Sequence, residues 1–349
     1  MKILVDICHP AHVHFFRHPL SRLAASGHET AVTSRAKDVT LELLDALGIP
    51  HTVLSTAGRG APALAAEYLH RTRGLLRTIR HFRPDVITGI SSLFLGPVGR
   101  LTGTPALVFS DTEHVKAERL TCRLAARYCT PEVFERDLGP RHRRYSGFHE
   151  LAYLDPRRFR PDPAVLAPLG LAEGERFTLL RLVSWTANHD RGHSGLSDEL
   201  RREAVARLSR HGRVLVSSEA PLPPDLRAHR LDAPVHRIHD VLALASLYLG
   251  EGATMATEAA FLGTPAVYVS SLAGTMGNFR ALQAADLVVS TRDGRAGLET
   301  AEALLVDPAA KAAWRTRAEA FAARQVDVAD YVRRSIEDVG LVRARAAAI

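Results

Sequence analysis

The sequence contains little cysteine and no long hydrophobic run. Its 349 residues include three cysteines, Cys8, Cys122 and Cys129, whose spacing matches no metal or disulfide motif. This excludes a disulfide-stabilised secreted domain and is typical of a reducing compartment. The apolar run at 241–249 is far shorter than the roughly 20 residues that a membrane-spanning helix needs. The amino-terminal apolar run meets Asp6 too early for a signal peptide. We therefore expect a soluble, cytoplasmic protein.

Lysine is scarce as well. Only four of the 45 basic residues are lysines, and the 38 acidic residues leave a net charge of +7. Apolar residues make up 46% and charged residues 24%, which is ordinary globular usage and excludes a disordered or collagen-like chain. We interpret the arginine excess as a soluble surface encoded by a GC-rich genome. The alternatives are a polyanionic partner or an anionic membrane surface. Because no RNA- or DNA-binding module pattern is present, we expect no nucleic-acid partner.

Short apolar runs alternate with longer helical patterns along the whole chain. This alternation is typical of a parallel sheet covered by helices on both faces. The runs expected to be strands are 3–5, 31–33, 86–88, 106–109, 177–183, 214–217, 247–249, 266–269 and 287–289. The length suggests two domains. We expect a doubly wound α/β domain at 1–165, a second one at 166–325, and a carboxyl-terminal helix at 326–349 that returns to the first domain.

The segment 249–265 is the richest candidate for a ligand site. Ligands of open parallel sheets bind beyond the carboxyl ends of the strands, and here a strand ends in small residues before a helix. Gly252 and Ala253 allow close approach of backbone N–H groups, and the helix amino end near Thr254 suits a diphosphate. Glu258, about one turn later, can accept two hydrogen bonds from a ribose diol. The alternative is a plain strand-to-helix turn in which Glu258 complements the helix dipole.

This segment resembles the nucleotide-sugar motif of the GT-B superfamily, in which a Gly-rich turn opens a helix and Glu-Ala-x-x-x-Gly-x-Pro closes the unit. The characterised relatives are the peptidoglycan N-acetylglucosaminyltransferase and the non-hydrolysing UDP-N-acetylglucosamine 2-epimerases. The whole chain is similar to an uncharacterised bacterial and archaeal family of about this length in the same superfamily. Its patterns match 6–16, 181–185, 189–190, 217–219 and 250–265. The resemblance implies a GT-B-like fold, with two Rossmann-like domains facing across a cleft.

The resemblance also implies roles for particular residues. Gly252, Ala253 and Thr254 would hold the diphosphate, Glu258 the ribose, and Asn278 the donor sugar. The loop before Asn278 lacks the glutamines that the transferase uses.

Three histidines, His9, His12 and His14, follow the first predicted strand within six residues. His12 and His14 with His9 or Asp6 have the spacing of a zinc site. They can instead supply a general base or a donor to phosphate, since imidazole titrates near neutrality. A third interpretation is a capped helix start. The GT-B resemblance favours an active-site group, because its members often carry a histidine in this loop. We therefore predict His12 and His14 as catalytic candidates and expect no bound metal.

Two further loops carry ionisable residues after predicted strands. Asp111 and Glu113 can deprotonate an acceptor hydroxyl, although Asp111 alone can simply cap a helix. After the run at 177–183, Ser184 and Asn188 can bond phosphate or sugar hydroxyls, and His189 or its neighbour can act on the substrate. His189 and the histidine four residues later have metal-like spacing, but the glycines around them disfavour a helix that would present them.

The stretch 68–83 places five arginines among apolar residues. Such a basic amphipathic helix can lie on anionic lipid, and it equally has the pattern of a crossover helix that packs one stripe on a sheet. Peripheral contact with the inner face of the membrane is therefore one of two interpretations.

Together these observations favour a glycosyltransferase-like enzyme that uses a nucleotide diphosphate sugar, with UDP as the expected nucleotide, in cell-surface, polysaccharide or glycolipid biosynthesis. The acceptor is expected to be a sugar or a lipid-linked compound, and no cofactor is needed because the nucleotide sugar is a substrate. One alternative is an enzyme like UDP-N-acetylglucosamine 2-epimerase. An alternative of another class is a nucleotide-sugar-binding protein without turnover.

Overall fold

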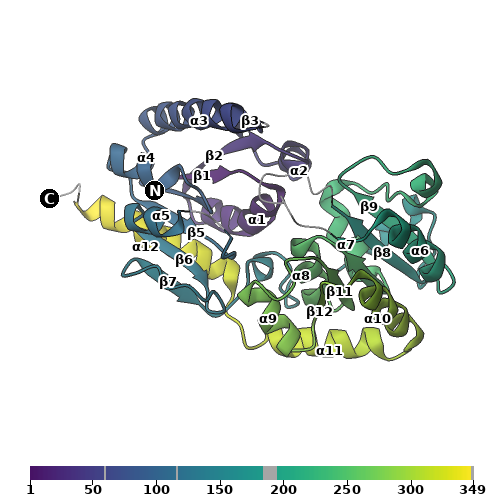
Figure 1. The fold of residues 1–349 in the computed structure, drawn as a ribbon. Coiled ribbons are helices and arrows are strands. Elements are labelled where there is room, and N and C mark those ends of the chain that lie inside the picture. The colour runs from purple at the N-terminus through teal and green to yellow at the C-terminus, as the bar shows by residue number, and fades with distance from the viewer. Residues whose placement is uncertain (59, 115–116, 184–194, 347–349) are drawn as a thin grey trace. The chain divides into compact units, whose positions relative to one another are not determined.

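The computed structural model describes residues 1–58, 60–114, 117–183 and 195–346, which form two compact units (Figure 1). Unit 1 comprises Met1–Tyr153 and Gln325–Ile349, and unit 2 comprises Leu154–Arg324. The first division falls before the boundary expected at residue 165 because the intervening segment packs on unit 2. Asp162 there receives a hydrogen bond from Arg237 at 2.8 Å, and its own N–H donates to Asp240 at 2.9 Å.

Unit 1 is built on a parallel sheet of seven strands in the order β3-β2-β1-β4-β5-β6-β7. The strands are β1 (Lys2–Ile7), β2 (Glu29–Ala36), β3 (Thr52–Thr56), β4 (Val86–Ile90), β5 (Ala106–Phe109), β6 (Arg127–Pro131) and β7 (His142–Tyr145). Leu4 in β1 is aligned with Ala31 in β2 and with Ile87 in β4, so β1 lies in the middle of the sheet. Chain order runs outward from β1 in one direction and from β4 in the other, which places the topological switch point between them.

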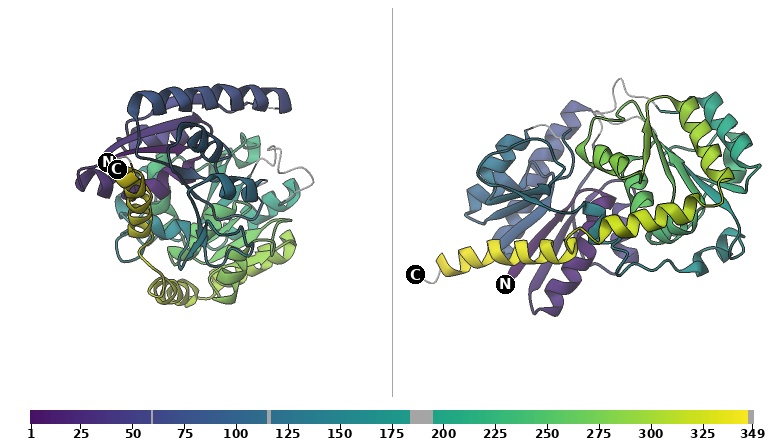
Figure 2. Two further views of the ribbon diagram at one scale, coloured as in Figure 1. Left: turned by 90° about the vertical axis from the view of Figure 1, so that its left-hand side faces the viewer. Right: turned by 90° about the horizontal axis from the view of Figure 1, so that it is seen from below.

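The helices of unit 1 cover this sheet. They are α1 (Pro10–Ala25), α2 (Thr40–Ala46), α3 (Ala61–Phe82), α4 (Leu95–Thr102), α5 (Glu118–Leu124), the 3₁₀ helix η1 (His149–Ala152) and α12 (Val328–Ala346). The carboxyl-terminal helix α12, yellow in Figure 2, packs on α1, β4 and β5. Its side chains Val328, Val332 and Ile336 are fully buried there, so the last helix completes the core of the first unit.

Unit 2 is built on a parallel sheet of five strands in the order β12-β11-β10-β8-β9. The strands are β8 (Phe177–Leu182), β9 (Arg213–Ser218), β10 (Leu247–Gly250), β11 (Ala266–Val269) and β12 (Val289–Thr291). The helices are η2 (Pro163–Val165), η3 (Ala167–Leu169), α6 (Asp198–Leu208), η4 (Pro224–His229), η5 (Val235–Arg237), α7 (Ile238–Leu244), α8 (Ala253–Phe261), α9 (Gly277–Ala284), α10 (Gly294–Val306) and α11 (Ala310–Ala322). The switch point of this sheet lies between β8 and β10.

The predicted fold class of two doubly wound parallel-sheet units is confirmed. Three strands were missed, namely β3, β6 and β7, and β12 begins two residues later than expected. The outer strand β7 has only one buried residue among four, and β3 has two among five. Edge strands such as β3 and β7 do not need the continuous apolar run that identifies a central parallel strand.

Helix α3 contains the arginine-rich stretch at 68–83. Leu75 and Ile79 on one face are buried, and the helix packs on β3 and α4 as a crossover helix does. Arg71 is fully buried as well, so it does not belong to the exposed basic face, whereas Arg73 and Arg77 are exposed. Within the described part of the chain, no helix combines the length and apolar character needed to cross a membrane.

A partly buried lysine on α11 closes the carboxyl end of α7. The Lys311 ammonium donates to the carbonyl of Ala243 at 2.7 Å, to the carbonyl of Ala245 and to Oγ1 of Thr264 at 2.9 Å. An amino group at this position donates to carbonyls that have no partner within the helix. Burial lowers the pKa of Lys311 to about 7.

This lowered pKa predicts a pH-dependent contribution to stability. Between pH 7 and about 10.4, the unfolded chain keeps the lysine proton and the folded chain has lost it, so the free energy of unfolding rises with pH. Between pH 7 and pH 9, we expect the free energy of unfolding of the wild-type protein to rise by about 1–2 kcal/mol relative to that of Lys311→Met. One titrating group can change this free energy by at most about 1.4 kcal/mol per pH unit. Urea denaturation of both proteins at several pH values measures this. A constant difference between them would contradict the prediction.

Candidate functional site

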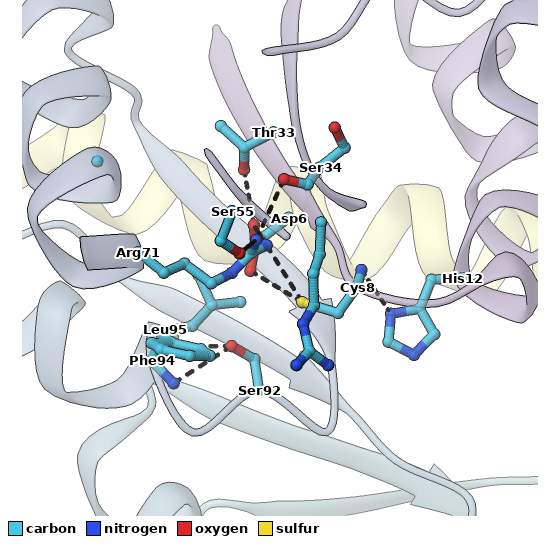
Figure 3. Close-up of polar contacts among 12 residues, drawn as sticks. Asp6, Cys8, His12, Thr33, Ser34, Ser55, Arg71, Ser92, Phe94 and Leu95 are labelled. Carbon is cyan, nitrogen blue, oxygen red and sulfur yellow. Dashed lines mark hydrogen bonds and ion pairs between the residues drawn. The ribbon is translucent and has the colours of Figure 1, made fainter. Parts of the chain in front are cut away.

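A buried ion pair lies at the carboxyl end of β1, which borders the switch point of unit 1, and its partners come from β2 and β3 (Figure 3). Asp6 near the end of β1 accepts from Arg71 of α3 at 2.5 Å and from Thr33 of β2 at 2.7 Å. Arg71 also donates to the carbonyl of Ser34 and to Oγ of Ser55, both at 3.1 Å. Because both charges are buried and paired, the aspartate is held in place at the start of the loop that follows β1.

A second ion pair continues this network. Arg35 binds Glu67 of α3 through two parallel hydrogen bonds of 2.6 and 2.7 Å. The hydroxyl of Ser55 donates to the same carboxylate at 2.9 Å while it accepts from Arg71. The hydrogen bonds from Arg35 and Ser55, together with the Gly58 backbone N–H, hold the pKa of Glu67 at about 2 despite its partial burial. The edge at the ends of β1, β2 and β3 is therefore fixed by linked side chains.

The histidine loop leads from β1 into α1. His9 caps the helix, since its Nδ1 accepts from the N–H of Ala11 at 3.2 Å, and Pro10 fits the first turn, where no N–H is needed. The N–H of Cys8 donates to Nδ1 of His12 at 3.3 Å. Burial and the neighbouring cationic groups lower the pKa of His12 well below its usual range. Burial raises the pKa of the Cys8 thiol well above its usual value, which makes this cysteine a poor nucleophile.

The second catalytic candidate of this loop has a different environment. His14 is buried on α1, and its ring stacks on Tyr153 with centroids 5.2 Å apart. The structure therefore places the His14 ring in the packing between α1 and the end of η1, and its catalytic role stays a prediction.

The acidic candidates after β5 also differ in exposure. The Asp111 side chain is 29% exposed, and its Oδ2 lies 3.4 Å from Nδ1 of the buried His149. Glu113 is only 7% exposed and accepts from the backbone N–H of Glu135 at 3.3 Å. Burial lowers the pKa of His149, and the Asp111 carboxylate partly offsets this. A carboxylate beside a neutral imidazole, at the end of a parallel strand, can accept a proton from a substrate.

In unit 2, the turn from β10 into α8 depends on small residues. A Cβ atom at Gly250 would lie 2.7 Å from Cβ of Arg181 and from the hydroxyl of Tyr248. That hydroxyl donates to the carbonyl of Gly252 at 3.0 Å. Arg181 in turn donates to Ser217 and Glu219 at the end of β9. The side chains of Arg181 and Tyr248 thus pack against this turn, which lies at the switch point of the sheet.

The predicted diphosphate and ribose residues follow at the amino end of α8. Gly252 is the N-cap, Ala253 begins the helix and Thr254 is exposed. Glu258, one turn later, is only 5% exposed, and its Oε1 lies 3.0 Å from Nε2 of His239 on α7. Sequence reasoning missed His239. The structure therefore brings the small-residue turn, the helix amino end and a carboxylate held by an imidazole together.

Asn278 lies in the first turn of α9 and is buried. Its Oδ1 has no hydrogen-bond partner among the residues that the structure describes. Buried amide oxygens nearly always have a partner, which can be water or a ligand. The other predicted donor residues Ser184, Asn188 and His189 lie outside the described residues.

Glu251, which was not among the predicted site residues, links the end of β8 to the turn between β10 and α8. Glu251 is buried and accepts from the N–H of Val183 at 2.7 Å and of Leu196 at 2.6 Å. Arg201 of α6 lies at 3.3 Å from the same carboxylate. Gly195 is required beside it, because a Cβ there would lie 2.1 Å from Oε1 of Glu251. The two strand ends of the switch point are thus joined by one side chain.

Glu251→Gln is expected to lower the free energy of unfolding by about 1–3 kcal/mol. The amide nitrogen would face one of the two backbone N–H donors and leave it unsatisfied. Urea denaturation beside Glu299→Gln, an exposed position on α10, separates this effect from a general loss of charge. A variant as stable as the Glu299 control would contradict the assignment.

The zinc alternative requires several ligand side chains that lie close together. In the described ranges, no group of three histidine, cysteine or acidic side chains is placed to hold a metal ion. The Nδ1 atoms of His9 and His12 both accept backbone N–H groups.

Comparison with solved structures identifies the fold. A UDP-GlcNAc 2-epimerase from Neisseria meningitidis, bound to UDP-GlcNAc, has a TM-score of 0.66 at 12% identity over 98% of this chain and 100% of its own. The spinosyn rhamnosyltransferase SpnG, complexed with spinosyn aglycone, has a TM-score of 0.63 at 16% identity over 96% and 99%. The UDP-GlcNAc 2-epimerase of Methanocaldococcus jannaschii has a TM-score of 0.61 at 10% identity over 88% and 93%. At such identities the likeness establishes a GT-B-like fold alone.

The sequence itself gives the family. The comparison with curated proteins returned no match. A family model with the description "Protein of unknown function (DUF354)" matches residues 1–196, which is more than half of the 349 residues. The predicted resemblance to an uncharacterised family within the GT-B superfamily is thereby confirmed. The chain belongs to the DUF354 family.

Proposed function

We propose that this protein is a glycosyltransferase that uses a nucleoside diphosphate sugar as donor, with UDP as the nucleotide. The observation that carries the proposal is the buried Glu258, one turn into α8 and held by His239. A carboxylate in this position can accept both hydroxyls of a ribose, while the N–H groups at the start of the helix face the diphosphate. The turn lies at the switch point of the unit 2 sheet, where such ligands bind in open α/β folds.

In this proposal, unit 2 holds the donor. Gly252, Ala253 and Thr254 bind the diphosphate. Asn278 offers its Oδ1, which has no partner among the described residues, to a hydroxyl of the sugar. Ser184, Asn188 and His189 are proposed to contact the phosphates or the sugar. The nucleotides in the related structures agree in chemistry, since the Neisseria epimerase is bound to UDP-GlcNAc and SpnG is also known with thymidine diphosphate. Both contain a pyrimidine nucleoside diphosphate.

Unit 1 supplies the proton acceptor. The predicted catalytic candidates are His12, His14, Asp111 and Glu113. We assign this role to Asp111, because its carboxylate is more exposed than that of Glu113 and lies beside His149. The acceptor hydroxyl loses its proton to Asp111 as its oxygen bonds to the anomeric carbon, and the nucleoside diphosphate leaves with the bonding electrons. Amide groups at the start of α8 stabilise the charge that develops on the departing diphosphate. No cofactor is required for this displacement.

The acceptor is proposed to be a sugar or a lipid-linked compound that the protein meets as a peripheral, cytoplasmic enzyme. The face of α3 that points away from the sheet exposes Arg73, Arg77 and Arg80 together with Leu69. Arginines and apolar side chains on one exposed helix face can bind anionic lipid headgroups.

An epimerase is the second candidate, because a UDP-GlcNAc 2-epimerase is similar in fold over 98% of this chain. It would share the donor site and need no acceptor. Product analysis separates the two. Only an epimerase interconverts the C2 stereoisomers of UDP-GlcNAc, whereas a transferase without an acceptor slowly hydrolyses its donor. A protein that binds the nucleotide and gives neither reaction would be a nucleotide-sugar-binding module.

The experiment that tests the proposal is thermal denaturation with a panel of nucleotides. We expect UDP to raise the free energy of unfolding by RT ln(1 + [UDP]/Kd), about 2.7 kcal/mol at a hundredfold excess over Kd. ADP and GDP serve as matched controls with the same diphosphate and a purine base. Equal or absent stabilisation by all three would contradict a uridine nucleotide site.

A further inference from the structure

The backbone at the start of α1 determines which nitrogen of His12 carries a proton. The N–H of Cys8 can only donate, and it donates to Nδ1 of His12 at 3.3 Å (Figure 3). That nitrogen must therefore hold a lone pair. Since a neutral imidazole has one protonated and one unprotonated nitrogen, the remaining hydrogen lies on Nε2. The loop thus presents His12 with an N–H group at its outer nitrogen.

The Asp6–Arg71 pair holds the donor of this hydrogen bond in place. Arg71 Nη2 lies 2.5 Å from Oδ1 of Asp6 and 3.2 Å from Sγ of Cys8, while the thiol donates to Oδ2 of Asp6 at 3.5 Å. Arg71 is 0% exposed and Asp6 is buried, so neither partner is free to move into solvent. Residue 8 is therefore fixed through its side chain, and its N–H is fixed with it.

The charges around His12 favour the neutral ring. The ionisable groups that act on it are His9 from its own loop, His149 from η1, Lys37 after β2 and Arg71 from α3. Burial is the largest cause of its lowered pKa, and all four of these groups oppose a positive charge on the imidazole. A second proton would also have to displace the Cys8 hydrogen bond at Nδ1. Residue 12 as a whole is nevertheless partly exposed.

We propose that His12 is a neutral hydrogen-bond donor to an oxygen atom of the substrate, and that it is not the proton acceptor of the reaction. His12 follows β1 at the switch point of the sheet, where ligands bind in open α/β folds, and the Asp6–Arg71 pair is the positioning device that fixes its tautomer. A donor here stabilises negative charge on a phosphate, carboxylate or reacting hydroxyl oxygen. The identity of that oxygen rests on the proposed function; the tautomer does not.

The tautomer can be measured without any substrate. In protein labelled with ¹⁵N-histidine, the His12 resonances are assigned as those that disappear in His12→Gln. We expect an unprotonated Nδ1 and a protonated Nε2 at every pH between 6 and 8. A protonated Nδ1, or a titration of the ring within that range, would overturn the proposal whether or not the protein transfers sugars.

A pair of substitutions then tests the role in turnover. Glutamine at position 12 places an amide N–H near the position of Nε2 but cannot take a proton, whereas alanine offers neither group. We expect the kcat of His12→Gln to stay within about tenfold of the wild-type value. The kcat of His12→Ala should be about tenfold lower than that of His12→Gln. A general base would instead give losses of about 10²–10⁴-fold in both variants, which overturns the proposal. Wild-type kcat in both variants also overturns it. His18→Gln, the same change farther along α1, is the control and stays within about twofold.

Discussion

Asp111→Asn is expected to lower kcat by about 10²–10⁴-fold while the Kd for UDP changes by less than about twofold. Loss of a general base removes an interaction made mainly in the transition state, so it appears in turnover and spares ground-state binding. Asparagine keeps the shape of the side chain, so its contact with His149 at 3.4 Å can be retained while the basic oxygen is lost. Donor consumption measured beside calorimetric UDP titration gives both quantities.

Glu113→Gln is the matched control for this experiment. Glu113 lies two residues away and carries the same charge, but it is buried and accepts a backbone N–H from Glu135. We expect its kcat to fall by less than about tenfold. If Asp111→Asn retains near-normal turnover and Glu113→Gln does not, the proton acceptor is Glu113. If both lose UDP binding, the assignment of the nucleotide to unit 2 is wrong.

The central strands and the turn after β10 could be predicted from the sequence because their signals are local. A parallel strand that is buried on both faces, such as β4 with five buried residues, reads as an apolar run without any knowledge of its neighbours. The turn at Gly250 likewise shows its need for small residues in the sequence, although only the structure identifies Arg181 and Tyr248 as the cause.

The partners of the site residues could not be predicted, because they come from distant parts of the chain. Arg71 lies 65 residues after Asp6, and the sequence pattern of α3 placed it with the exposed arginines of a basic face. Its burial depends on the carboxylate that β1 brings next to α3. His239 similarly meets Glu258 only because α7 packs beside α8. His239, which stands between Ile238 and Asp240 in the sequence, carries no local signal of such a pairing.

The second large effect is expected at the donor site. Glu258→Ala should weaken UDP binding by about 10²–10⁴-fold and raise the donor KM in parallel. A carboxylate that accepts two ribose hydroxyls loses two charge-assisted hydrogen bonds, each worth about 1.5–3 kcal/mol, and every 1.4 kcal/mol is a factor of ten in affinity. kcat should change less, because Glu258 holds the ground state and the transition state alike.

The burial of Glu258 makes a second variant necessary, since alanine leaves a gap beside His239. Glu258→Gln has the same shape and keeps one amide oxygen, so we expect an intermediate loss of UDP affinity of about tenfold. Glu299→Gln on the exposed face of α10 removes the same charge from unit 2 and should bind UDP as wild type does. Calorimetric titration of the three variants, each checked for cooperative thermal unfolding, gives the ranking. Unchanged UDP affinity in a folded Glu258→Ala protein would remove the ribose role, and with it the observation on which the proposed function depends.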